Sequence, residues 1–212
     1  RSGESSDDGK NGNADRSIKR LVCSKDEVTG IHCRLLPYTR AIISGLATPA
    51  DAHAFSERIT KELSFPDGVR LMDRPAHYDG GVNHLFVRAE QAANVGREIS
   101  LCYIHADIRY AESMCHLGEG EKALDALKKI NPINLDEIVK NAARRQSNAY
   151  FSSSDPDFND RYDFAKGIAD LKEGKAAVRG GWRVYSSGNG IYIARLIGDL
   201  FGLRPQKGAL II

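Results

Sequence analysis

Apolar side chains recur at helical spacing in several segments of the chain. Residues 48–63 begin with Thr-Pro-Ala-Asp and continue with an apolar residue every three or four positions, namely Ala52, Phe55, Ile59 and Leu63. Threonine is a preferred N-cap residue, and proline is favoured at the first helical position. The pattern therefore predicts a helix that ends near Leu63 and buries these four side chains.

Residues 82–117 carry a second helical pattern, with a break predicted at Asn94-Val95-Gly96. The stripe that we expect to be buried in its second half consists of Leu101, Ile104, Ile108, Ala111, Met114, Cys115 and Leu117. Gly118 follows, and apolar positions in residues 121–130 predict a short return helix that stops at Asn131-Pro132. Residues 99–130 are thus predicted to form one α/α hairpin.

Three further segments have shorter patterns. Residues 158–171 predict another helix, whose face mixes polar and apolar side chains. Residues 21–43 have apolar positions without a sustained helical period, and their last part suits either a buried helix or a strand. The apolar tail at residues 209–212 is typical of the first strand of a further domain.

A turn-rich loop is predicted at residues 65–79, which contain two prolines and an Asp-Gly pair. Its charged residues are candidate sugar ligands, because carboxylates and guanidinium groups form hydrogen bonds with neighbouring hydroxyls. They are Asp67, Arg70, Asp73 and Arg74. Structural salt bridges explain the same residues equally well.

Residues 186–190 read Ser-Ser-Gly-Asn-Gly and precede an apolar helical pattern that reaches Phe201. This is interpreted as a polar glycine loop that leads into the N-terminus of a helix. Such a loop can direct backbone N–H groups and hydroxyls towards an anion, which the helix dipole also favours. From spacing alone, an ordinary helix cap is the commoner explanation.

His105, Arg109 and Glu112 share one face of the helix predicted in the second half of residues 82–117. A single histidine in such a helix is usually a satisfied core residue. Spacing therefore gives no reason of its own to assign His105 to a binding site.

Composition excludes several classes. The 212 residues are 42% apolar and carry a formal charge of +2, so the chain has a core and no strong field for nucleic acid or an anionic membrane. Four cysteines without C-x-x-C spacing indicate a reducing compartment. No apolar run approaches the roughly 20 residues of a membrane span, and we expect a cytoplasmic protein. The polar residues 1–16 and the absence of an initial Met indicate a linker or insertion in a longer protein.

Four separated runs of sequence carry a family resemblance. They are F-P-D-G-V-R-L-M-D-R-P from Phe65, Y-I-H-A-D-I-R-Y-A-E from Tyr103, R-Q-S-N-A-Y-F-S-S-S-D-P-D-F-N-D-R-Y from Arg145 and G-G-W-R-V-Y-S-S-G-N-G-I-Y from Gly180. Together they resemble the C-terminal part of the cellobiose phosphorylase family. The closest branches are the 1,2-β-oligoglucan phosphorylases and the phosphorylase-like end of cyclic β-1,2-glucan synthases, and the similarity covers residues 35–204.

The resemblance implies an all-α fold that is part of a six-hairpin (α/α) barrel, with the start of a C-terminal β domain. Residues 1–20 would be a flexible polar linker, residues 21–204 the C-terminal part of the barrel, and residues 205–212 the start of the β domain. No strict internal repeat is visible in the residues themselves.

The resemblance also implies phosphate-dependent, inverting cleavage of β-linked glucan oligosaccharides to glucose 1-phosphate. Residues that match the family's phosphate site are His105, Ser186, Ser187 and Gly188. Ala-Asp-Ile follows His105 where many members have an asparagine pair, and Y-S-S-G replaces the commoner T-G-T, which leaves open which hydroxyl binds phosphate. Sugar recognition is expected from a run rich in hydroxyls and amides and from the charged loop, with Arg145, Gln146, Asn148, Tyr150, Asp73 and Arg74 as candidates.

The general acid of that family lies N-terminal to every matching run, so no catalytic residue is expected in this chain, and the isolated chain is predicted to be inactive. No metal-ligand spacing, P-loop or dinucleotide-binding motif occurs in the sequence, which predicts no metal or cofactor beyond phosphate as co-substrate. A serine hydrolase is rejected, because no glycine stands two residues before Ser186 or Ser187. Expected partners are the glucan, phosphate, the rest of a longer chain and a second copy, but not nucleic acid. The alternatives are a module of a cyclic β-1,2-glucan synthase and a non-catalytic carbohydrate-binding helical domain.

Overall fold

The computed structural model describes residues 27, 30–75, 102–131, 135–143, 152–182 and 186–211 of the chain. The predictions for residues 1–20, for the helix at 82–101 and for the break at 94–96 lie outside these ranges. Helices make up most of the described residues, which confirms the predominantly helical class.

The first helical pair consists of α2 (Leu35–Ile43) and α3 (Pro49–Arg58), which continues as a π-helix, η1 (Ile59–Leu63). The side chain of Thr48 accepts a hydrogen bond from the Asp51 N–H at 3.2 Å and caps α3. The predicted helix that ends near Leu63 is therefore confirmed, and its four apolar positions are buried. Of the two structures open for the end of residues 21–43, the helix is the one formed.

The second pair consists of α5 (Ile104–His116) and α6 (Gly120–Lys129), joined by a turn in which Gly118 has a φ of +74°. Glycine adopts this left-handed conformation at little cost, so the chain reverses directly after α5. The α/α hairpin is confirmed for these residues. The prediction that it was helical from residue 99 is wrong at Cys102 and Tyr103, which form strand β3 (Cys102–Tyr103).

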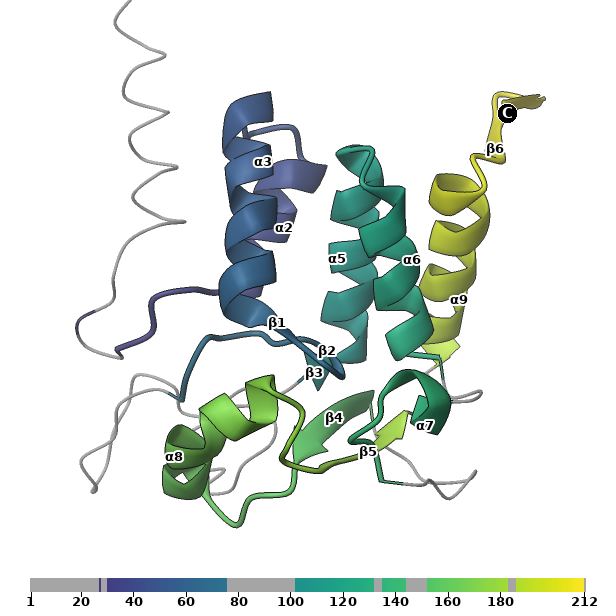
Figure 1. The fold of residues 1–212 in the computed structure, drawn as a ribbon. Coiled ribbons are helices and arrows are strands. Elements are labelled where there is room, and N and C mark those ends of the chain that lie inside the picture. Colours follow the sequence, from purple (N-terminus) through teal and green to yellow (C-terminus); the bar gives the residue numbers. More distant parts are fainter. Residues whose placement is uncertain are drawn as a thin grey trace, which may run out of the picture.

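The helices form two layers (Figure 1). One layer consists of α2, α5 and α9 (Ser186–Arg195, continued by the π-helix η2, Leu196–Leu200), which run in the same direction. The other layer consists of α3 and α6, which run in the opposite direction. Helix α5 lies in the middle and packs against α2, α6 and α9. Its buried stripe includes Ile104, Ile108, Ala111 and Met114, as predicted. Burial of an Ile or Met side chain contributes about 1.5–3 kcal/mol, so the buried face of α5 makes a large contribution to the core.

A smaller layer lies at the end of the molecule where α5 and α9 begin (Figure 1). It contains α7 (Leu135–Ile138), α8 (Arg161–Lys172) and a three-stranded antiparallel sheet of β3, β4 (Ser152–Pro156) and β5 (Val178–Trp182), in that order. Asp160 caps α8 by accepting hydrogen bonds from the N–H groups of Tyr162 and Asp163. The helix predicted from residue 158 therefore begins at Arg161.

Two hairpins complete the described structure, β1 (Ser64–Phe65) with β2 (Gly68–Val69), and β6 (Arg204–Gln206) with β7 (Ala209–Ile211). The strand predicted in the apolar tail is thus present. The all-α prediction needs one correction, because it omitted the β3-β4-β5 sheet. Strand β3 has two residues and β4 reads Ser-Ser-Ser-Asp-Pro, so neither has the alternating apolar pattern by which a strand is recognised.

Candidate functional site

The three-stranded sheet joins three of the runs that the sequence analysis identified. Tyr103 of the Y-I-H run pairs with Ser153, and Ser153 pairs in turn with Gly181 of the G-G-W run. Segments that are distant in the sequence therefore lie next to each other through backbone hydrogen bonds. Strand β3 leads directly into α5, which carries His105, and β5 ends at Trp182, shortly before the helix that carries the Ser-Ser-Gly segment.

Helix α9 begins at Ser186, so residues 186–190 are the first turns of the helix itself. The prediction of a separate glycine loop before the helix is wrong here, because these residues adopt helical backbone conformation. The first four N–H groups of a helix have no partner within it, and the dipole makes this end favourable for an anion. Gly188 is buried, whereas the structure describes only the backbone of Ser186 and Ser187.

Helices α5 and α9 pack side by side and run in the same direction, so their N-terminal ends lie at the same end of the molecule (Figure 1). His105 is in the first turn of α5, and no side chain caps that helix through its N-cap residue Tyr103. The two N-termini place the partial positive charges of two dipoles near the sheet. The structure therefore brings the predicted phosphate residues of both runs to one end of a helix pair.

The imidazole of His105 is partly buried and contacts Tyr103. Its Nδ1 atom lies 3.0 Å from the Tyr103 hydroxyl oxygen, and the two rings meet edge to face. Burial, and then the positive charge of Arg109, lower the pKa of His105 below its ordinary value. At neutral pH the ring is therefore uncharged and carries a single N–H donor.

A chain of charged side chains connects α5 to α9 on the face that carries His105. The buried carboxylate of Glu112 lies 2.5 Å from Arg109 Nη1 and 2.6 Å from Arg195 Nη1, and Arg195 also binds Asp199 at 2.7 Å. Asp199 in turn contacts Arg204 at 3.0 Å. Because Glu112 belongs to α5 and Arg195 to α9, this contact fixes the position of one helix along the other.

The charged loop at residues 65–75 is largely structural. Arg70 and Asp67 are fully buried and form a two-pronged ion pair, with distances of 2.7 and 3.1 Å. A sugar cannot reach these groups, so their prediction as sugar ligands is wrong and the salt-bridge alternative holds. The pair is next to Asp107, whose carboxyl group accepts hydrogen bonds from the Val69 N–H and from the Cys102 thiol.

Asp73 is buried, and its carboxylate accepts hydrogen bonds from the backbone N–H groups of His32 and Cys33, each at 2.9 Å. Arg74 binds its other oxygen at 2.7 Å. These contacts give Asp73 a structural role, and its contact with a sugar stays a prediction.

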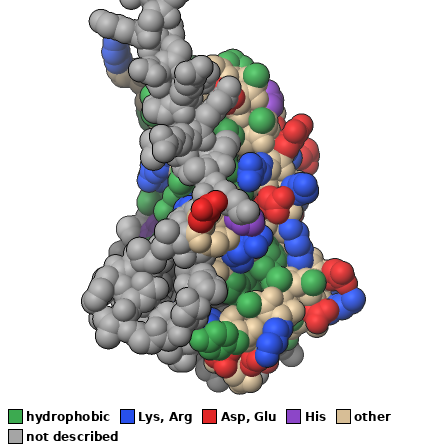
Figure 2. Space-filling model, turned by 90° about the vertical axis from the view of Figure 1, so that its left-hand side faces the viewer, with side chains coloured by type: hydrophobic (Ala, Val, Ile, Leu, Met, Phe, Trp, Pro, Cys, Tyr) green, Lys and Arg blue, Asp and Glu red, His purple; other side chains and the backbone are tan. Residues whose placement is uncertain are grey.

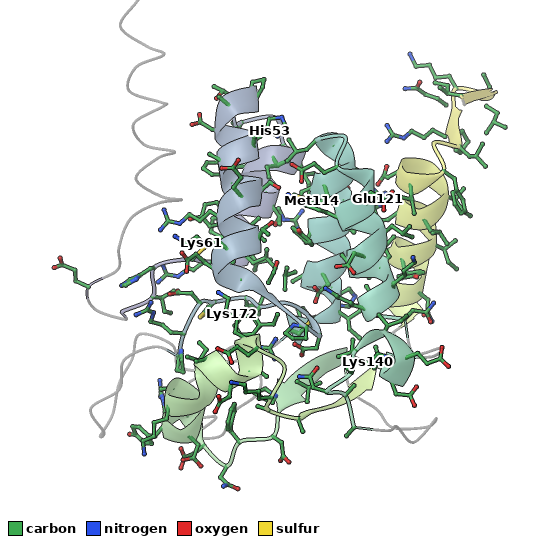
Figure 3. All side chains as sticks on the ribbon, viewed as in Figure 1. His53, Lys61, Met114, Glu121, Lys140 and Lys172 are labelled. Carbon is green, nitrogen blue, oxygen red and sulfur yellow. The ribbon has the colours of Figure 1, made fainter. Side chains whose placement is uncertain are left out.

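Arg74 is about half exposed, with 47% of its side chain accessible. It lines a cavity of about 490 Å³ between η1, β1 and α8, together with Glu62, Phe65 and Lys172. Figure 3 shows Lys172 of α8 below η1, where its ammonium donates a hydrogen bond to the Lys61 carbonyl at 2.5 Å. A cavity lined by charged side chains of both signs suits a polar ligand. The candidates Arg145, Gln146, Asn148 and Tyr150 lie outside the described residues.

Two residues of this region, Tyr103 and Arg195, were not identified in the sequence analysis. A tyrosine two positions before a histidine is a weak local signal. Arg195 could be paired in advance only with Asp199, four residues further along its own helix. Its contact with Glu112 depends on how two helices pack.

Charged side chains of both signs are interspersed over the described part of the face in Figure 2. Within the described ranges, no group of three or more His, Cys, Asp or Glu side chains is arranged to hold a metal ion. No helix among these residues has the length and apolar character needed to cross a membrane.

The sequence of this chain is similar to those of known proteins. Residues 16–159 match the family described as the glycosyl hydrolase 94 superfamily, catalytic domain. The chain is also 51% identical over 191 residues to a 1,2-β-oligoglucan phosphorylase from Listeria innocua. That alignment covers 90% of this chain and 18% of the relative, so the chain spans less than a fifth of the relative's length.

Proposed function

This chain belongs to the glycosyl hydrolase 94 superfamily, and we propose that it is a segment of an inverting β-glucan phosphorylase. In the proposed reaction, an oxygen of inorganic phosphate attacks the anomeric carbon of a β-linked glucosyl residue. The bond from that carbon to the leaving sugar oxygen breaks, and a carboxylic acid protonates the oxygen. The products are glucose 1-phosphate and a shortened glucan. Phosphate is the co-substrate, and the reaction requires no metal or organic cofactor.

The observation that carries this proposal is the parallel packing of α5 and α9 with their first turns at one end. Two helix N-termini supply free N–H groups and two aligned dipoles, which favour a bound dianion. His105 and residues 186–188 are in these first turns. The same positions match the phosphate residues of the family that the sequence resembles.

The roles proposed for these residues follow from the needs of a phosphate nucleophile. A phosphate dianion attacks without a general base, but it must be held in line and must not be protonated. Neutral donors meet both needs. We assign this role to the neutral His105 imidazole, to the Gly188 N–H and to the hydroxyl of either Ser186 or Ser187.

Sugar recognition is proposed for the residues that precede the sheet and for the Arg74 cavity. Arg145, Gln146, Asn148 and Tyr150 belong to the run that also contains β4, and Tyr150 is two residues before Ser152, the first residue of β4. β4 pairs with β3, the strand that leads into His105, and on this basis we propose that these residues bind sugar next to the phosphate. Arg74 and Asp73 would contribute from the loop after β2.

The domain assignment also remains a proposal. Two layers of antiparallel helices, with α2, α5 and α9 parallel to one another, are what consecutive hairpins of an (α/α) barrel produce. We propose that residues 21–204 form part of such a barrel and that the β6–β7 hairpin starts a C-terminal β domain across residues 205–212. Residues 1–20 would link this part to preceding sequence, and the general acid would lie outside residues 1–212.

The test uses the longer protein that carries this chain. We expect purified protein to release glucose 1-phosphate from β-linked gluco-oligosaccharides only when inorganic phosphate is present. His105→Ala should lower the rate at limiting phosphate on the order of 10²-fold, as removal of one donor from a preorganised anion site does.

His53→Ala is the matched control, because His53 is an exposed residue of α3 at the far end from the sheet (Figure 3). It should behave as the wild type. Hydrolysis that does not require phosphate would contradict the proposed function. Equal rates for His105→Ala and His53→Ala would contradict the proposed phosphate site. A protein that binds glucan but never forms glucose 1-phosphate would support the non-catalytic alternative.

A further inference from the structure

Tyr103 and His105 form a hydrogen bond at the start of α5. The Tyr103 hydroxyl oxygen lies 3.0 Å from Nδ1 of the imidazole, and the ring centroids are 5.3 Å apart in an edge-to-face arrangement. Tyr103 is the last residue of β3, and its backbone pairs with Ser153 of β4. The sheet therefore holds the tyrosine backbone in place beside the histidine.

The direction of this hydrogen bond follows from the chemistry of the two groups. A phenol is a good donor and a poor acceptor, because its oxygen lone pair is delocalised into the ring. An unprotonated imidazole nitrogen is the better acceptor of the pair. When the Tyr103 hydroxyl donates to Nδ1, the single proton of the neutral ring is on Nε2.

We propose that Tyr103 is a positioning residue, which keeps His105 in the tautomer that presents an Nε2–H donor to a phosphate oxygen. This inference rests on the proposed function. Without the tyrosine hydroxyl, the ring can also place its proton on Nδ1. Nε2 would then direct a lone pair towards the phosphate oxygens, which repels the anion instead of binding it.

The surroundings of His105 support the assignment. Arg109 lies one turn further along the same face of α5 and is bound to Glu112, which also binds Arg195 of α9. Burial and Arg109 both lower the pKa of His105, so the ring is neutral at physiological pH. Only a neutral imidazole has two tautomers, and a hydrogen bond at a ring nitrogen favours one of them. At Nδ1 of His105, the Tyr103 hydroxyl makes this bond.

The first experiment compares Tyr103→Phe with Tyr110→Phe in the longer protein. Both variants lose one hydroxyl from a tyrosine at or in α5, but Tyr110 is buried in the core and its hydroxyl interacts with Thr60. We expect Tyr103→Phe to raise the KM for phosphate by about tenfold, the lower end of the loss in affinity when a metal-bound histidine loses its orienting partner. The KM for the glucan should not change, and Tyr110→Phe should leave both constants unchanged.

The second experiment identifies the nitrogen that faces phosphate. The side-chain amide nitrogen of Gln reaches the position of histidine Nε2, whereas that of Asn reaches the position of Nδ1. We expect His105→Gln to keep more of the phosphate affinity than His105→Asn. Adding Tyr103→Phe to His105→Gln should not raise the KM for phosphate further, because an amide has no tautomer to select.

The outcomes separate this inference from the proposed function. If His105→Ala raises the KM for phosphate but Tyr103→Phe behaves like Tyr110→Phe, only the role of Tyr103 is refuted. An Asn variant that binds phosphate better than the Gln variant refutes the assignment of Nε2. Wild-type phosphate kinetics in His105→Ala would refute the proposed phosphate site, and the role of Tyr103 would be refuted with it.

Discussion

Glu112→Ala should weaken phosphate binding although Glu112 is not proposed to touch phosphate. The substitution removes the buried carboxylate that holds Arg195 of α9 against α5. A hydrogen bond to a charged group contributes about 1.5–3 kcal/mol. Arg195 is 25% exposed and keeps Asp199 as a partner, so we take the lower value, about 1.5 kcal/mol. Since about 1.4 kcal/mol corresponds to a factor of ten, the KM for phosphate should rise by up to roughly tenfold, the full rise requiring that all of this free energy serves to align the two helix N-termini.

The assay is initial-rate kinetics of glucose 1-phosphate release in the longer protein, with phosphate and glucan varied separately. Glu112→Gln retains an oxygen acceptor for Arg195 and should have a smaller effect. Arg204→Ala removes the exposed outer member of the same chain of charges and serves as the control, with no expected change. Unchanged phosphate kinetics in a folded Glu112→Ala variant, or an equal rise in both KM values, would refute the view that this contact aligns the two helix N-termini.

Three further predictions concern the buried charges and the isolated chain. Asp67→Ala should cost about 3–5 kcal/mol in the free energy of unfolding, because it leaves Arg70 buried and unpaired. Glu62→Ala at the exposed Lys61 pair should cost at most about 1 kcal/mol in the same denaturation assay, and equal losses would contradict the first value. Burial raises the pKa of Asp107 to about 7, so its contribution to stability is full below about pH 4 and is lost as the pH rises to about 7. Asp107→Asn should make the denaturation midpoint less dependent on pH over that range. An unaltered pH dependence would count against a protonated Asp107. Residues 1–212 alone should release no detectable glucose 1-phosphate, because general acid catalysis is worth about 10² to 10⁴-fold. Measurable phosphorolysis by the isolated chain would show that the acid lies within it.

Elements whose signals are local could be predicted from the sequence. Thr48 and Pro49 start α3 because a cap and a preset φ act within one turn. The α5–α6 hairpin follows from the apolar stripe of each helix and from Gly118, which all lie within a few residues of one another. The resemblance of four runs indicated the family, which the match to residues 16–159 confirms.

How these elements form a site depends on contacts between residues that are distant along the chain. Strand β4 consists of Ser, Asp and Pro, which have little intrinsic preference for strands, and it is extended because β3 and β5 supply hydrogen bonds on both sides. The two arginines of the loop looked alike in the sequence, yet the fold buried Arg70 with Asp67 and left Arg74 half exposed. Likewise, Glu112 meets Arg195 only because α5 and α9 pack in parallel. Such contacts join residues that are distant along the chain, so their free energy depends on a geometry that no local pattern encodes.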